Sequence, residues 1–118
     1  MIESEVVDSF NTRLTVDVSN LKRLTPGQRD QVKHYGSQAE SLLKSRDLAM
    51  FVHHYRFELN DALINITNHT DLDNATRIAM ANYLSGLDGF VTSLRRAVHN
   101  RNKVLAFENN PGQITPNV

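Results

Sequence analysis

The chain has 118 residues, of which 13 are basic and 13 acidic, so its formal net charge at pH 7 is zero. This balance disfavours a protein that coats nucleic acid without sequence preference, because such proteins carry a clear positive excess. The absence of cysteine excludes disulfides and thiolate metal sites. The apolar runs are too short to span a membrane, and the acidic start MIESEVVDSF lacks the features of a signal peptide. We therefore expect one domain in the cytoplasm, or inside another cell compartment or a virus particle.

The first periodic segment runs from about Ile2 to Leu24, with apolar residues that recur every three or four positions. They are Val7, Phe10, Leu14, Val18 and Leu21. This period predicts one face of a helix, and the acidic residues near its start complement the helix dipole. Its threonine and valine residues are poor helix formers, so packing rather than propensity must stabilise it.

The second helix is predicted from Pro26 to about Lys44. Thr25 can cap it, proline suits the first helical position, and Gln28 completes a capping box. Gly36 lies inside this helix at a cost of about 1 kcal/mol relative to alanine. Close approach of another helix would be one reason to keep a glycine there.

The third helix is predicted to follow a short turn near Asp47 and to end at about Thr67. Its apolar stripe has the 3–4 spacing of a single helical face, which must be buried against neighbouring helices. The stripe comprises Leu48, Val52, Tyr55, Leu59, Ala62 and Ile66, widened by Phe51 and Leu63.

The last periodic segment runs from Asp71 to about Phe107, behind a second capping pattern at Thr70 and Asp73. As one helix it would be roughly 50 Å long. Gly86 and Gly89 therefore predict a kink or a break near its middle, or else its second half projects and pairs with another subunit. The sequence as a whole predicts an all-α fold, an antiparallel bundle of four helices over residues 1–107, or five if the last one breaks. Residues 108–118 are predicted to form a flexible tail.

A basic stripe on the last helix is the most distinctive surface feature. Arg95, Arg96, His99 and Lys103 fall within about 100° of one another on a helical projection. Such a stripe can bind phosphate backbone or an acidic partner. The alternative is that these residues complement the dipole at the helix C-terminus and keep the surface solvated.

The histidines show no metal-ligand spacing, and His54 and Glu58 predict a surface pair one helical turn apart. Arg46, followed after six residues by His53, resembles the Arg-x4–6-His motif of the HEPN family, whose members are helical, often dimeric and in many cases ribonucleases. The resemblance covers about ten residues and occurs at an earlier helix than in that family. It implies that Arg46 stabilises a phosphate and that His53 acts as general acid or base.

Other catalytic signatures are missing from the sequence, including a glycine-rich phosphate loop and a Gly-x-Ser-x-Gly turn. We therefore expect a non-catalytic helical adaptor or regulator of the phage or bacterial type, without cofactor or metal. It would bind another protein and self-associate, and Met50, Phe57 and Phe90 are candidates for the self-association patch because they lie off the main stripes. The alternatives are a nucleic-acid-binding module that uses the basic stripe and a HEPN-like ribonuclease.

Overall fold

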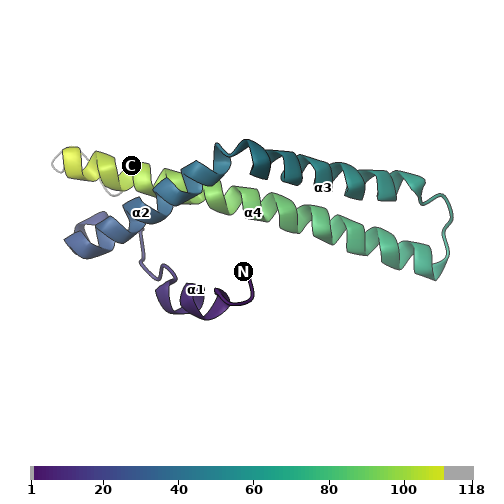
Figure 1. The fold of residues 1–118 in the computed structure, drawn as a ribbon, viewed down its shortest axis with the longest axis horizontal. Helices are drawn as coiled ribbons and strands as arrows, with labels where there is room; N and C mark the ends of the chain where they lie inside the picture. Colours follow the sequence, from purple (N-terminus) through teal and green to yellow (C-terminus); the bar gives the residue numbers. More distant parts are fainter. Residues whose placement is uncertain (1, 111–118) are drawn as a thin grey trace. The chain divides into compact units, whose positions relative to one another are not determined.

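The computed structural model describes residues 2–110, and all regular secondary structure in this range is helical (Figure 1). The helices are α1 (Val6–Thr12), the 3-10 helix η1 (Leu21–Arg23), α2 (Pro26–Leu43), α3 (Arg46–Asn65) and α4 (Asp71–Asn109). The predicted all-α class with four α-helices is thus confirmed for these residues. Residues 111–118 of the predicted tail lie outside the described range.

The first helix is much shorter than predicted, and the expectation of one helix from Ile2 to Leu24 is wrong. α1 has only seven residues and no buried side chain. The Thr12 hydroxyl donates to the Asp8 carbonyl oxygen at 2.7 Å at its end, and irregular chain follows as far as η1. A segment of poor helix formers needs packing to stay helical, and α1 has no buried face.

The starts of the three longer helices follow the capping chemistry of the sequence. Thr25 and Gln28 form the predicted capping box, in which each side chain accepts from the other residue's backbone N–H at 3.1 and 2.9 Å. The Ser45 hydroxyl accepts from the Leu48 N–H at the start of α3. Thr70 and Asp73 make the same reciprocal pair at the start of α4.

α4 is continuous over 39 residues, so of the alternatives that the sequence left open, a break at Gly86 and Gly89 does not occur. Neither glycine has a positive φ, and both keep the helical conformation. The helix also extends to Asn109, beyond the end predicted at Phe107. Two glycines lower helix propensity by only about 2 kcal/mol together, which a helix packed along its length can tolerate.

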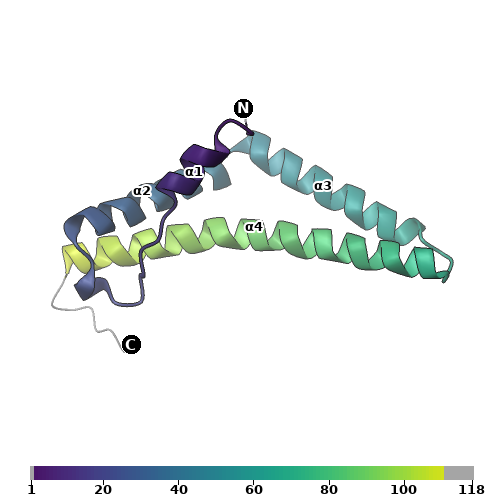
Figure 2. The ribbon, with the colours of Figure 1, turned by 90° about the horizontal axis from the view of Figure 1, so that it is seen from below.

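The described residues form two compact units, which we name by their content. The crossing unit comprises residues 2–37 and 97–110, and the hairpin unit comprises residues 38–96. In the crossing unit the start of α2 packs antiparallel against the end of α4, as Figure 2 shows. Val32 and Val104 are fully buried there, and Leu24 and Ala97 complete the core.

Gly36 allows a very close contact between α2 and α4 in the crossing unit. A Cβ atom at this position would lie 2.3 Å from the Arg101 Cβ and 2.6 Å from the Ala97 carbonyl oxygen. Only a residue without a side chain fits this distance. The predicted reason for a glycine inside α2, close approach of another helix, is confirmed.

Ion pairs connect the start of α2 to the end of α4 in the crossing unit. The Glu108 carboxylate accepts from Arg29 Nε at 2.9 Å and from Lys33 Nζ at 2.7 Å. The hydrogen bonds from Lys33 and Arg29 hold the pKa of Glu108 below its ordinary value, and the bond to Glu108 raises the pKa of Lys33. Glu108 thus ties the last turns of α4 to the first turns of α2.

The hairpin unit pairs α3 with the first part of α4, antiparallel and joined by residues 66–70 (Figure 1). Arg56 Nη1 donates to Asp88 Oδ1 at 2.5 Å between the two helices. Arg77 fastens the loop by donating to the carbonyl oxygens of Ile66 and Asn68. The large side chains that are buried here are few, chiefly those of Leu59 and Leu94.

Candidate interaction surfaces

The predicted basic stripe is exposed at all four positions. Arg95 and Arg96 belong to the hairpin unit, whereas His99 and Lys103 belong to the crossing unit. Among the described residues, none of the four makes an ion pair. Their charged and polar groups are therefore accessible to a partner. This exposure agrees both with a binding role and with a surface that is only solvated.

The HEPN-like residues both lie on α3. Arg46 is the first residue of this helix and His53 is about two turns further on, at roughly 10 Å along the axis. Both side chains are exposed. Within one copy the helix places the two residues on one face, two turns apart along its axis.

The predicted surface pair of His54 and Glu58 is confirmed, with Nε2 and Oε1 2.9 Å apart and both side chains exposed. No cluster of three or more potential ligands for a metal ion occurs in residues 2–110. In the same range, every buried polar side-chain atom has a hydrogen-bond partner.

The three predicted self-association residues are all exposed, two of them on α3 and one on α4. Met50 and Phe57 lie seven residues apart on one line of α3, and Ile64 continues this line. Phe90 lies on α4. Met50, Phe57 and Ile64 thus form one exposed row on α3.

Phe90 belongs to an aromatic face of the hairpin unit. Phe51 and Tyr55 are one turn apart on α3, and Tyr83 and Phe90 are two turns apart on α4. Their exposed fractions range from 41 to 74%. We call these four residues the aromatic face.

The Arg56–Asp88 ion pair shows that the two halves of the aromatic face lie on the same side of the hairpin. Phe51 precedes Arg56 by five residues and Tyr83 precedes Asp88 by five residues, a rotation of about 140° on each helix. The two helices run antiparallel, so equal rotations around their axes, counted from the Arg56–Asp88 ion pair, turn both aromatic pairs toward the same side. Both pairs therefore lie on the side of the hairpin opposite this ion pair.

The sequence pattern assigned Phe51 and Tyr55 to the buried stripe of the third helix, and this assignment is wrong. The steps of three and four residues are correct, but the buried face of α3 is narrower than the stripe and centres on Leu59. Two helices can cover only a narrow arc of each other. This stripe contains more apolar residues than a single neighbouring helix can bury. That excess in the sequence could have indicated an exposed apolar surface on α3.

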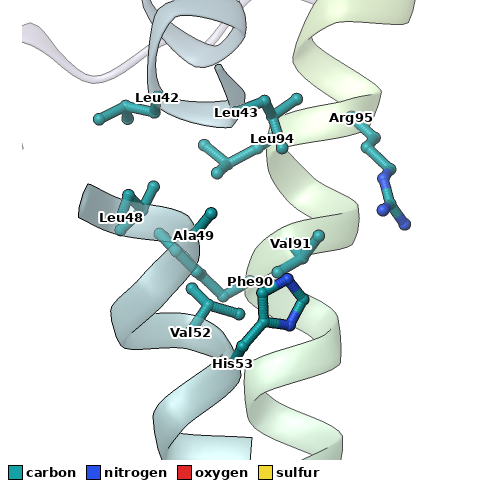
Figure 3. A pocket seen from close by; sticks show the side chains of 10 residues that line it. All are labelled: Leu42, Leu43, Leu48, Ala49, Val52, His53, Phe90, Val91, Leu94 and Arg95. Atoms are coloured by element: carbon teal, nitrogen blue, oxygen red, sulfur yellow. The ribbon is translucent and has the colours of Figure 1, made fainter. Parts of the chain in front are cut away.

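A cavity of about 140 Å³ lies in the hairpin unit, where the end of α2, the start of α3 and the middle of α4 meet (Figure 3). Most of its walls are apolar, formed by Leu42, Leu43, Leu48, Ala49, Val52, Phe90, Val91 and Leu94. His53 and Arg95 add polar groups at its edge. Figure 3 shows the imidazole directed toward α4 near Val91, and the guanidinium extending away from the apolar side chains.

Comparison of the chain with protein-family models, with curated proteins and with solved structures gave no match. Among residues 2–110, no helix combines the length and the apolar character needed to cross a membrane. A functional assignment therefore depends on the surfaces described above.

Proposed function

We propose that this protein is a non-catalytic helical adaptor or regulator that binds other proteins and self-associates. The observation that carries this proposal is the aromatic face of the hairpin unit. Leaving a large aromatic side chain exposed to water is unfavourable, and aromatic residues are enriched at protein interfaces. Four of them on one side of a helical hairpin favour an interaction surface.

The size of the aromatic face fits a second copy of the hairpin. With 150–250 Å² available per aromatic side chain, four half-exposed rings offer roughly 400 Å² of apolar surface. A standard interface covers about 800 Å² per partner, of which a little over half is apolar. The aromatic face thus supplies about the apolar area that one side of such an interface needs.

Pairing of two such faces would also produce the architecture expected from the sequence. Two antiparallel hairpins stacked face to face form an antiparallel four-helix bundle. In this arrangement the bundle forms between two copies, and the aromatic residues become its inner layer.

Sedimentation equilibrium of the wild type and of two double variants tests this proposal. We expect a dimer for the wild type and at least a tenfold weaker dimer for Phe51→Ser with Tyr83→Ser. Met50→Ser with Phe57→Ser is the matched control, since it removes equally exposed apolar side chains from the other row. A wild type that stays monomeric and recovers no partner from cell extract would contradict the proposal, and dissociation by the control variant alone would move the interface to that row.

A second candidate function is nucleic-acid binding, favoured by Arg95 and Arg96, which are exposed and make no ion pair in the described structure. Phosphate contacts weaken steeply with added salt. For this function, Arg95→Ala with Arg96→Ala should reduce both RNA or DNA binding at low salt and the salt dependence. Unchanged binding by this variant would remove the candidate.

A further inference from the structure

α1 is a helix without a packing surface of its own. It has seven residues and no buried side chain, and residues 2–13 are all exposed. Isolated helices shorter than about 12–15 residues are marginal in water, so a helix this short needs a surface to pack on. A complementary surface that packs against α1 would therefore stabilise it.

The chemistry of α1 defines what that site must offer. Val6 and Phe10 are one turn apart on the same face, and the Phe10 side chain is 62% exposed. The segment also carries Glu3, Glu5 and Asp8. Arg13 lies 3.8 Å from the Phe10 ring centroid and covers one side of the ring. A complementary site would accept one aromatic ring and present positive charge beside it.

The cavity of the hairpin unit has this character. Its volume of about 140 Å³ is close to the 150 Å³ of an engineered apolar cavity that holds one benzene molecule. It is smaller than the roughly 300–1,000 Å³ of typical small-molecule sites, which favours a single side-chain anchor. Arg95 is exposed at its edge, and no ion pair satisfies its guanidinium within the described residues.

We propose that this cavity binds α1 of a second copy of the chain, with Phe10 inserted among the apolar walls and an acidic residue of α1 facing Arg95. Docking of an amphipathic helix into an apolar groove is a common mode of recognition. Exchange of the same segment in both directions closes a symmetric dimer, a frequent route to homodimers. The inference rests on the proposed self-association, which already brings two copies together.

Because the chain contains no cysteine, a single Ser9→Cys variant can carry a nitroxide label at one known position on α1. This copy is mixed with wild type that carries ¹³C-labelled leucine and valine methyl groups. Only a contact between copies can then broaden the methyl signals. We expect broadening at Leu48, Val52 and Val91, and none with a diamagnetic label of the same size.

Two variants of the methyl-labelled copy separate specific docking from general charge attraction. Arg95→Gln should weaken the broadening by about tenfold, the effect of losing one charge-assisted contact. Arg96→Gln, which removes the same charge from the next residue and does not line the cavity, should leave it unchanged. Equal losses in the two variants would overturn the proposal.

Two further outcomes would also overturn it. One is the absence of broadening in the mixed sample, and the other is broadening that appears only when both labels are on the same chain. Sedimentation separates this failure from failure of the proposed function. A dimer without broadening rejects the docking alone, whereas a monomer at every concentration rejects both.

Discussion

The crossing unit and the hairpin unit each contain a pair of antiparallel helices, but the two pairs use small and large residues differently. In the crossing unit, Gly36 brings α2 so close to α4 that valines suffice to fill the contact. In the hairpin unit, the contact buries only a few residues around Leu59 and Leu94, and bulky aromatic side chains remain outside it.

This difference shows what a pair of helices can bury. Small residues allow close backbone approach, so that two helices exclude water along their contact without a third element. Large residues on a wider arc extend beyond the reach of one neighbour and need another layer of structure. The crossing unit thus closes its own helix–helix contact, whereas the hairpin unit leaves large apolar side chains exposed.

The largest effect is expected from Gly36→Ala. The added methyl group would lie 2.3 Å from the Arg101 Cβ and 2.6 Å from the Ala97 carbonyl oxygen, so α2 and α4 must separate. Overpacking of this kind should lower the free energy of unfolding by about 2–3 kcal/mol. Urea unfolding monitored by circular dichroism measures it, and unchanged stability would show that the contact is looser than described.

The opposite sign is expected at the glycines of the hairpin unit. Apart from the adjacent residues and the nearby backbone of α4 itself, no atom of the described residues lies within 4 Å of a Cβ built at Gly86 or Gly89. Alanine at either position should therefore stabilise α4 by about 1 kcal/mol, through helix propensity alone. The same unfolding experiment tests this, and destabilisation would indicate that a partner covers this side of α4 in solution.

Helix positions and their starts followed from the sequence wherever local chemistry decides them. The capping residues Thr25 and Thr70 placed the starts of α2 and α4 correctly, because a cap depends on residues only three positions away. The first segment failed since its helicity depended on packing that the structure does not provide. Local pattern cannot supply a packing partner.

The candidate surfaces were predictable only in part, for a related reason. Periodicity showed that Phe51 and Tyr55 share an apolar stripe on α3, but the width of the buried arc depends on the neighbouring helix. The joining of Phe51 and Phe90 in one face depends on the register of α3 against α4. That register is set by contacts such as Arg56–Asp88, which are 32 residues apart in sequence and leave no local pattern.

The smallest change in the free energy of unfolding is expected from Glu108→Gln in the crossing unit. Lys33 and Arg29 hold the pKa of Glu108 below its ordinary value of 4.5. The contribution of these ion pairs to stability is therefore complete above pH 4.5 and is lost as the pH falls through the lowered pKa of the folded protein. The variant should be less stable than wild type at neutral pH, by less than the glycine changes because all three side chains are partly exposed.

Below pH 4.5 the difference between wild type and Glu108→Gln should shrink and then vanish, and unfolding curves at a series of pH values measure it. Asp30→Asn is the matched control, because Asp30 also pairs with Lys33, at 3.2 Å, but is 73% exposed. It should change stability less at every pH. A difference that stays constant down to the acid limit would mean that the carboxylate charge of Glu108 does not join α2 to α4. The stability of the crossing unit would then come from the close contact at Gly36 and its valine core.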